Sequence, residues 1–295
     1  WRPQSFNDVA GQEVTMSMLR NSLYKNHLFP VYLFAGQKGC GKTSSARIFA
    51  AAVNCEKLPQ FQKNATGQVV PCQNCTACQT MKNGSFPDFI EIDAASHTGV
   101  DDVRALLESC SFMPLAGTHK IYLIDEAHML SRAAFNALLK ILEEPPQTVI
   151  FMLATTEYTK IPETVRSRCF QLHFSALSPE ALTAYLQKIC DAEQIAYEKE
   201  GLALLVQQTD GSARDAVNLL EQVRFTGTTI TVEQVRQALG ILNGADLALL
   251  LALMLENNAP GMLSLLAEKG IASLGAAHIW DLFLSLCRAV QLWHY

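Results

Sequence analysis

The segment from Tyr32 to Ser44 constrains the fold of this chain more than any other, because it reads YLFAGQKGCGKTS. An apolar run suited to a buried strand passes into the spacing G-x-x-x-x-G-K-[ST] and then into good helix formers. Strand, glycine loop and helix in this order are the context that a phosphate-binding loop requires. The glycines let backbone N–H groups approach a phosphate, and the helix N-terminus adds about half a positive charge. The segment therefore predicts nucleotide binding.

The residues of this loop have separate expected roles. Lys42 is expected to reach the β- and γ-phosphates, and the Thr43 hydroxyl is expected to ligate Mg²⁺. We interpret Cys40 as a small filler rather than a reactive thiol. The residues expected to surround the nucleotide are Gly36, Gln37, Lys38, Gly39, Cys40, Gly41, Lys42, Thr43 and Ser44.

Two adjacent acidic residues follow the apolar run Ile121 to Ile124. Asp125 is suited to hold Mg²⁺, directly or through water, and Glu126 is suited to polarise the water that attacks the γ-phosphate. Solvated acids also occur at strand ends without such a role, but the phosphate loop upstream favours the functional interpretation. His128 is expected to be structural or to support the catalytic groups from a second layer.

Apolar runs and helical periods together predict an α/β fold. Strands alternating with helices imply a parallel sheet with helices on both faces, and nucleotide sites in such sheets lie at the carboxyl ends of the strands. From Ser178 onward the pattern is helical only, with Ser178 as the first N-cap. The expected strands are 31–34, 89–92, 121–124, 149–154 and a last strand through Leu172 and Phe174, and the expected helices are 11–27, 44–53, 100–111, 132–142, 179–193, 198–209, 212–224 and 231–239, before a leucine-rich region.

Length and charge narrow the class of protein. The 295 residues are 49% apolar, which predicts more than one domain with sizeable cores. Since no apolar run reaches about 18 residues and no signal-peptide pattern is present, we expect a cytoplasmic protein without a membrane segment. The start at Trp1, without Met, suggests a fragment. The net charge of −5 argues against a freestanding nucleic-acid binder. Basic and acidic side chains nearly balance in residues 1–174, whereas acidic side chains are in excess in residues 175–295. Any DNA contact is therefore expected from residues 1–174.

Three of the nine cysteines stand as Cys72-x2-Cys75-x2-Cys78. In a cytosolic nucleotide-binding protein, this clustering indicates a metal rather than disulfides. Thiolates in a C-x2-C array favour tetrahedral Zn²⁺, and Cys55 is the nearest fourth ligand. An iron–sulfur run would need a further cysteine soon after Cys78, and none follows there. The sequence predicts a closed, structural zinc site on a tight turn, preceded by a polar stretch over 56–70 without a clear period.

Four further residues are singled out by position alone. Thr155 and Thr156 end a strand expected beside the one that bears Asp125, where a hydroxyl could contact the γ-phosphate or the attacking water. Arg168 lies on the approach to the last strand and could be offered to a neighbour's nucleotide. Arg214 lies at the start of a helix and could close onto phosphate. Taken alone, each arginine is more often a solvated or ion-paired side chain.

A series of motifs occurs in one order along the chain. The motifs are Trp1-Arg2-Pro3, Asp8 to Gln12 (DVAGQ), the phosphate loop, the cysteine run, Glu91 to Ser96 (EIDAAS), Ile124 to Ser131 (IDEAHMLS), Leu138 to Pro146 (LLKILEEPP), Leu153 to Thr156 (LATT) and Ser167-Arg168-Cys169. Together they resemble the gamma/tau subunits of the bacterial DNA polymerase III clamp loader, a family of AAA+ ATPases. The resemblance covers almost the whole chain.

The resemblance implies a role for each of the singled-out residues. Lys42 and Thr43 correspond to Walker A, and Asp125 and Glu126 correspond to Walker B. Thr156, with Thr155 as the alternative, corresponds to sensor 1, and Arg214 corresponds to sensor 2. Arg168 corresponds to the arginine finger that completes the site of the adjacent subunit. Val9 and Ala10 lie where the family lines its adenine pocket, and Cys55, Cys72, Cys75 and Cys78 match its zinc ligands.

The resemblance also implies an architecture and a function. It predicts a RecA-like AAA+ domain over 1–174 with a zinc module at about 55–84, a helical lid over 175–239, and a truncated helical collar over 240–295. It implies ATP, Mg²⁺ and Zn²⁺ as cofactors, and ATP-driven opening and loading of a sliding clamp onto primed DNA. The expected partners are other clamp-loader subunits in a hetero-oligomeric ring, the clamp, primed DNA and, through an absent C-terminal region, polymerase and helicase. The expected location is the replisome at the bacterial nucleoid, and any polymerase label would belong to the holoenzyme, since no polymerase site is visible.

Two departures and two alternatives accompany this interpretation. The loop between Cys55 and Cys72 is longer than the family pattern. His97 and Gly99 stand where members often carry basic residues, with only Arg104 retained, so DNA contact there is expected to be weak or shifted to other subunits. One alternative is a non-hydrolysing structural subunit of the same assembly, against which the intact loop and Glu126 speak. The other is a protein-remodelling AAA+ motor, which should carry a pore-loop aromatic that the sequence does not clearly offer.

Overall fold

The computed structural model describes residues 1–64, 69–96, 99–227, 229–241 and 244–268, together with Trp280, Leu284 and Arg288. His97 lies outside the described residues. Internal contacts divide the chain into two compact units. The first comprises Trp1–Ile189 and Val206–Val217, and the second comprises Cys190–Leu205 and Asn218–Tyr295. Among the described residues, no helix has the length and apolar character needed to cross a bilayer.

A parallel five-stranded sheet in the order β2-β3-β4-β1-β5 forms the centre of the first unit. Its register pairs Ala35 with Thr155 and Asp93 with Asp125, so the carboxyl ends of the strands meet at one edge. The predicted parallel sheet is therefore confirmed. Its strands are β1 (Val31–Gly36), β2 (Phe89–Asp93), β3 (Lys120–Asp125), β4 (Val149–Thr155) and β5 (Phe170–Phe174).

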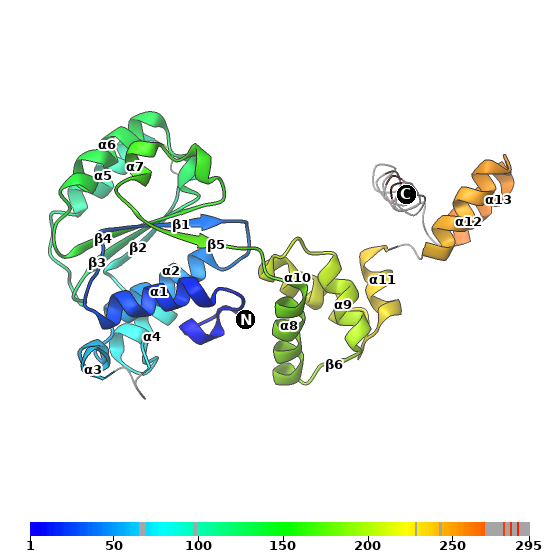
Figure 1. Ribbon diagram of the computed structural model, residues 1–295, viewed down its shortest axis with the longest axis horizontal. Coiled ribbons are helices and arrows are strands. Elements are labelled where there is room, and N and C mark those ends of the chain that lie inside the picture. Colours follow the sequence, from blue (N-terminus) through cyan, green and yellow to red (C-terminus); the bar gives the residue numbers. More distant parts are fainter. Residues whose placement is uncertain are drawn as a thin grey trace. The chain divides into compact units, whose positions relative to one another are not determined.

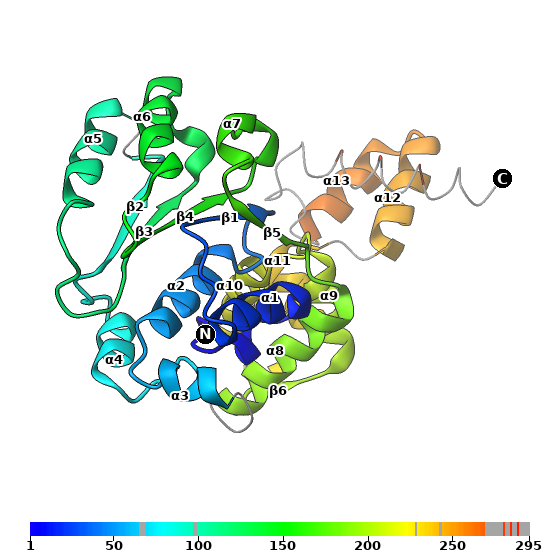
Figure 2. The ribbon, with the colours of Figure 1, turned by 60° about the vertical axis from the view of Figure 1, so that its left-hand side comes forward.

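Helices cover both faces of this sheet, as Figures 1 and 2 both show. Successive side chains of β1 explain why, since they alternate between the two faces. Val31 and Leu33 join the core beneath α5 and α6, whereas Tyr32 packs on Phe49 of α2 with ring centroids 4.9 Å apart. One face carries α5 (Val100–Ser109), α6 (Arg132–Glu143) and α7 (Glu163–Arg166), and the other carries α1 (Glu13–Tyr24) and α2 (Lys42–Val53), on which α3 (Leu58–Lys63) and α4 (Thr76–Lys82) pack.

A buried carboxylate fixes the loop that leads into β3. The Asp88 side chain is fully buried and accepts backbone N–H groups of Leu115, Ala116 and Gly117, each at 2.7 Å. A buried carboxylate is tolerated only with such partners, because burial otherwise opposes the charge. The loop in turn sets the start of β3 and thereby the position of Asp125 at its end. The sequence analysis did not single out Asp88.

The insertion between α2 and β2 differs from the sequence-based expectation. The stretch 56–70 contains the helix α3, and Cys78 lies on the helix α4 rather than on a tight turn. Both helices are shorter than the lengths at which isolated helices are stable, so packing must hold them. Phe61 of α3, for example, is buried against Tyr24 with ring centroids 6.0 Å apart. Such short helices give too few turns for a periodic signal in the sequence.

The chain after β5 is mainly helical, as predicted. Ser178 Oγ accepts the Ala181 N–H at 3.2 Å, which confirms Ser178 as an N-cap. In the second unit, β6 (Ala196–Tyr197) and β7 (Thr229–Ile230) form a short parallel pair that the sequence analysis did not predict. The helices are α8 (Pro179–Glu193), α9 (Lys199–Gln207), α10 (Ala213–Arg224), α11 (Val232–Leu239), α12 (Gly244–Leu255) and α13 (Ala259–Glu268), and single turns lie at η1 (Phe6–Asp8), η2 (Ala127–Met129) and η3 (Tyr158–Lys160).

Candidate functional site

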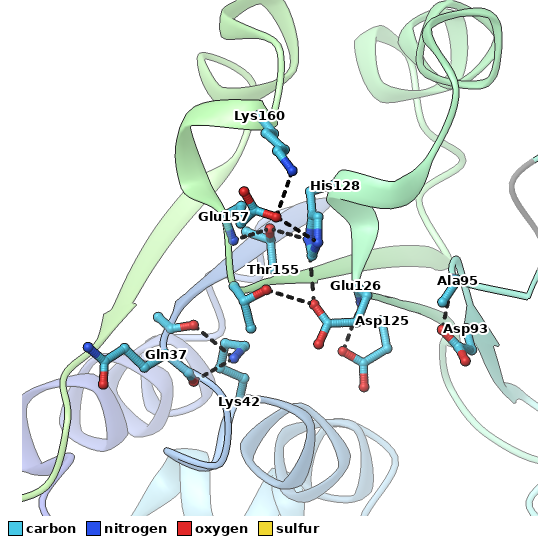
Figure 3. Close-up of polar contacts among 12 residues, drawn as sticks. Gln37, Lys42, Asp93, Ala95, Asp125, Glu126, His128, Thr155, Glu157 and Lys160 are labelled. Atoms are coloured by element: carbon cyan, nitrogen blue, oxygen red, sulfur yellow. Dashed lines mark hydrogen bonds and ion pairs between the residues drawn. The ribbon is translucent and has the colours of Figure 1, made fainter. Parts of the chain in front are cut away.

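The phosphate loop joins β1 to α2 at the carboxyl edge of the sheet, where Figure 3 shows Lys42 beside Gln37. The Lys42 side chain is buried, and its Nζ donates to the carbonyls of Gly36 at 2.9 Å and of Gln37 at 2.7 Å. These carbonyls offset the cost of burying an ammonium group. Because an ammonium group has three donors, Lys42 keeps one for a phosphate oxygen.

Two glycines of the loop are required by close approaches. A Cβ on Gly36 would lie 2.2 Å from the carbonyl oxygen of Phe174 in β5. Gly39 has a φ of +76°, and its Cβ would lie 1.9 Å from Ser212 Oγ. The carbonyl of Gly39 also accepts the Ala213 N–H at 3.1 Å. The loop is therefore held between β5 and the start of α10.

The other predicted loop residues take positions that fit a phosphate cradle. Cys40 is buried and donates from Sγ to the Gln37 carbonyl at 2.8 Å, and burial raises the pKa of its thiol. This disfavours the thiolate and agrees with its interpretation as a filler. Lys38 is exposed, Gly41 caps the N-terminus of α2, and Ser44 lies half-buried in its first turn.

The segment before α1 lies against the loop. Val9 is buried, and its Cγ1 would be 3.5 Å from a Cβ on Gly41, while Ala10 is half-buried. Gln12 is buried as well, and its amide donates to the carbonyls of Ser175 at 2.7 Å and Cys40 at 3.4 Å. Gln12 thus ties the loop to the end of β5. Sequence reasoning did not assign this role, and only its place in the DVAGQ motif signalled it.

The two acidic residues after β3 lie beside the loop. Thr43 Oγ1 donates to Asp125 Oδ2 at 2.8 Å, which brings the two predicted Mg²⁺ ligands together. Asp125 Oδ1 accepts the N–H of Glu126 at 3.0 Å. Glu126 has φ 47° and ψ 43°, a left-handed conformation that costs a non-glycine residue about 1–3 kcal/mol. Backbone strain of this kind often accompanies functional sites. Here the strained residue is Glu126, which directly follows the last residue of β3.

Neighbouring side chains hold the Glu126 carboxylate, as Figure 3 shows. Thr156 Oγ1 donates to Glu126 Oε2 at 3.1 Å. His128 Nδ1 lies 3.4 Å from the same oxygen and 3.1 Å from Thr155 Oγ1, and His128 Nε2 lies 3.4 Å from Glu157 Oε1. Of the two threonines, Thr156 contacts the acidic group and Thr155 contacts His128.

The two arginines lie in different surroundings. Arg168 is partly exposed, its Nη2 lies 2.7 Å from Glu143 Oε1, and its Nη1 donates to the Thr164 carbonyl at 2.6 Å. Within the described part of the chain, no hydrogen bond joins Arg168 to the phosphate loop. Arg214 is exposed in the first turn of α10, and its backbone N–H donates to the Gly39 carbonyl at 3.4 Å.

The four cysteines Cys55, Cys72, Cys75 and Cys78 form a second cluster, with all Sγ atoms within 4.8 Å of one another. A tetrahedral Zn²⁺ with Zn–S bonds of about 2.3 Å places its sulfurs about 3.8 Å apart. Backbone N–H groups approach the Cys55 and Cys72 sulfurs at 3.4 Å. A hydrogen bond from Cys78 lowers the pKa of Cys55, and the same contact raises the pKa of Cys78. The donor set and the spacing fit a structural zinc ion.

Two family models match consecutive parts of the chain. The model described as DNA polymerase III, delta subunit, matches residues 11–178. The model described as DNA polymerase III clamp loader subunit, ATPase lid domain, matches residues 181–228.

Curated relatives match across most of the chain. The DNA polymerase III subunit tau of Bacillus subtilis is 48% identical over 234 residues, which cover 79% of this chain and 40% of the relative. The tau subunit of Escherichia coli is 44% identical over 270 residues, covering 91% of this chain and 41% of the relative. The DNA polymerase III subunit gamma of Buchnera aphidicola subsp. Baizongia pistaciae is 43% identical over 259 residues, covering 88% of this chain and 68% of the relative. The chain thus spans about two fifths of the tau relatives' length.

Among solved structures, the RuvB Holliday junction branch migration motor of Thermotoga maritima superposes with a TM-score of 0.60 at 20% identity, over 91% of this chain and 85% of that one. At this identity the likeness shows the fold alone, and with the lid match it confirms the predicted AAA+ fold. The family is shown by the extent and identity of the gamma and tau matches. The chain belongs to the family of DNA polymerase III gamma and tau subunits.

Proposed function

We propose that this chain is an ATP-hydrolysing subunit of a clamp loader, which opens a sliding clamp and loads it onto primed DNA. The observation that carries ATP hydrolysis is the Thr43–Asp125 hydrogen bond beside the buried Lys42, and the clamp-loading part rests on the matched family. It joins the phosphate loop to the acidic end of β3, which is the arrangement needed to hold Mg²⁺ and a triphosphate together. The intact loop also argues against a non-hydrolysing structural subunit.

Each side chain has one proposed task in hydrolysis. Lys42 binds the β- and γ-phosphates. Thr43 and Asp125 would hold Mg²⁺, which would neutralise charge on the phosphates when bound. Glu126 accepts a proton from water as the water oxygen bonds to the γ-phosphorus and the bond to the β,γ-bridging oxygen breaks. Thr156 orients the Glu126 carboxylate through the contact at 3.1 Å. Val9 and Ala10 line the side of the loop where adenine would lie.

Two arginines are proposed to complete the site. The backbone N–H of Arg214 donates to the Gly39 carbonyl in the phosphate loop, and from this position its guanidinium can reach phosphate as a sensor. Arg168 is proposed to act on the nucleotide of the adjacent subunit, and its present partner supports this. The Arg168–Glu143 pair is exposed, and exposed ion pairs stabilise by only about 0–1 kcal/mol, so docking of a neighbour can replace it.

We propose three domains along the chain. Residues 1–174 form the nucleotide-binding domain with the zinc module at about 55–84, residues 175–239 form the lid, and residues 240–295 begin a collar. Zn²⁺ on Cys55, Cys72, Cys75 and Cys78 is structural, because four thiolates leave no open position for catalysis.

The partners and location are proposed from the family. They are other clamp-loader subunits in a hetero-oligomeric ring, the sliding clamp, primed DNA and, through a region beyond this segment, polymerase and helicase. The complex would work at the replisome on the nucleoid, in the cytoplasm. DNA contact near Gly99 and Arg104 is weak in this proposal, since Arg104 is the one basic residue that this segment retains and Asp101 and Asp102 lie beside it in α5.

Glu126→Gln in the full-length chain, assembled with its partner subunits, tests the hydrolytic proposal. Because Gln cannot accept the proton, ATP turnover should fall about 10²- to 10⁴-fold with ATP affinity retained. Glu144→Gln makes the same change at an exposed residue after α6 and should leave turnover unchanged. Full turnover in Glu126→Gln would disprove the catalytic assignment.

Arg168→Ala tests the contribution to a neighbouring site. The isolated chain should bind ATP as before, whereas DNA-stimulated hydrolysis by the assembly should fall roughly 10³-fold. Arg132→Ala, at an exposed arginine in the first turn of α6, serves as the matched loss of charge and should leave turnover unchanged. Wild-type turnover with Arg168→Ala would rule out the proposed role in trans.

A further inference from the structure

His128 lies between two carboxylates at the catalytic edge of the sheet. Its side chain is 8% exposed, and its two ring nitrogens lie near different carboxylates, those of Glu126 and Glu157 (Figure 3). Nδ1 lies 3.4 Å from Glu126 Oε2 and 3.1 Å from Thr155 Oγ1. Nε2 lies 3.4 Å from Glu157 Oε1. A buried histidine in van der Waals packing alone would not need this set of polar partners.

The contacts at Glu126 distinguish its two oxygens. Thr156 Oγ1 and His128 Nδ1 both approach Oε2. No hydrogen bond among the described residues uses Glu126 Oε1. Thr156 and His128 therefore occupy the Oε2 side of the carboxylate, and Oε1 is left as the oxygen that can face the attacking water.

The far side of the imidazole is anchored as well. Glu157 accepts Lys160 Nζ at 2.8 Å, and this hydrogen bond holds the pKa of the Glu157 carboxyl below its ordinary value. The backbone N–H of Glu157 donates to Thr155 Oγ1 at 3.0 Å. Thr155 therefore contacts His128 Nδ1 and the backbone of Glu157, the residue whose side chain lies near Nε2.

We propose that His128 is a positioning residue for ATP hydrolysis, which holds Glu126 Oε2 through Nδ1 so that Oε1 faces the attacking water. This inference rests on the proposed function, since it concerns the same carboxylate. His128 touches neither ATP nor water in this account and acts only through Glu126. Displacement of a reacting group by about 1 Å can lower the rate roughly 100-fold. Loss of the Nδ1 contact should therefore lower the rate of ATP hydrolysis measurably.

Three substitutions separate the two ring nitrogens. His128→Ala removes both contacts, His128→Asn keeps a donor near Nδ1, and His128→Gln keeps one near Nε2. In the full-length chain within its assembly, His128→Ala should lower kcat roughly 10- to 100-fold while leaving KM for ATP unchanged. His128→Asn should recover most of the loss, and His128→Gln should not.

Two companion variants keep the test decisive. Glu157→Gln retains His128 and should keep kcat well above that of His128→Ala, even if the histidine variants fold poorly. Lys188→Ala, at an exposed residue of α8 outside this network, should behave as the wild type. Equal rescue by Asn and Gln, a change in KM alone, an unchanged kcat in His128→Ala, or an equal loss in Glu157→Gln would overturn the proposal. Glu126→Gln in the same assay separates the outcomes, because its full activity would contradict the proposed function and not only the role of His128.

Discussion

The nucleotide site and the cysteine cluster are built in opposite ways. The first draws on the loop after β1, the acids after β3, the threonines after β4 and the start of α10, and these segments are distant in the sequence. The second takes all four cysteines from one insertion, between residues 55 and 78. A distributed site takes its geometry from the core, whereas we expect a local cluster to depend on a bound ion for its rigidity.

Packing around the two sites supports this difference. The central strands beneath the nucleotide site are buried, β4 along its whole length and β1 at all but its last residue. The cysteine cluster is bordered by α3 and α4, which have six and seven residues. Helices of this length are unstable alone, so an ion that ties Cys55, after α2, to Cys78 of α4 should contribute to the local stability.

The largest expected effect is that of removing the metal. Structural zinc contributes roughly 10–16 kcal/mol in small zinc-finger peptides, so loss of several kcal/mol is expected in this module. Cys75→Ser should abolish bound zinc and speed hydrogen exchange over α4, while the strands keep their protection. Cys190→Ala changes a cysteine outside the cluster and should retain the zinc. Equal loss of protection in β4 would contradict the local character of the cluster.

Asp88→Asn, which tests the sheet that supports the nucleotide site, should have the next largest effect. Hydrogen bonds to charged groups stabilise by about 1.5–3 kcal/mol, and this carboxylate accepts three N–H groups. The free energy of unfolding should fall by roughly 3 kcal/mol in urea denaturation. Asp93→Asn is a matched control at the end of β2, where the carboxylate is exposed. A change below that of the control would show that the buried contacts add nothing.

Gly39→Ala and Gly84→Ala separate crowding from backbone strain. Both glycines have a positive φ, +76° and +70°, but only Gly39 would meet another atom, Ser212 Oγ. Left-handed conformation alone costs an alanine about 1–2 kcal/mol, so both variants should lose that stability. Only Gly39→Ala should also weaken ATP binding, as measured by titration. Equal ATP affinities would refute the close packing of the loop against Ser212.

The smallest expected effect is that of Ser131→Ala at the N-cap of α6. Ser131 Oγ accepts the Ala134 N–H at 3.2 Å, and loss of such a cap costs about 1 kcal/mol. Thermal unfolding should report the loss, while zinc content and ATP affinity stay unchanged. A change in either ligand would mean that α6 is coupled to a site more strongly than its contacts imply.

The sequence predicted the parts of this fold whose signals are local. The strand before Gly36 and the acids after Ile124 were identified because spacing and apolar runs suffice to recognise them. The helices α3 and α4 were missed because they are too short for a period, and β6 and β7 because two-residue strands have none.

Contacts between distant segments could not be predicted. The role of Asp88 depends on a loop 27 residues away, and that of Gln12 on a carbonyl 163 residues away. The choice between Thr155 and Thr156 likewise needed the direction of each side chain at the end of β4. The roles of Arg168 and Arg214 remain predictions. The role of Arg168 depends on the nucleotide of a neighbouring subunit, and that of Arg214 depends on a bound phosphate.

Clamp loading by an assembly that contains Lys42→Ala is the most direct test of the central claim, that triphosphate held by this lysine drives the machine. Rates should be measured on primed DNA at an ATP concentration near the dissociation constant of the wild-type assembly, where a loss of affinity lowers the occupancy of the site. Loss of a charge-assisted contact of about 1.5–3 kcal/mol from a buried site should weaken ATP binding roughly 10- to 100-fold and reduce loading with it. An undiminished loading rate would contradict the account.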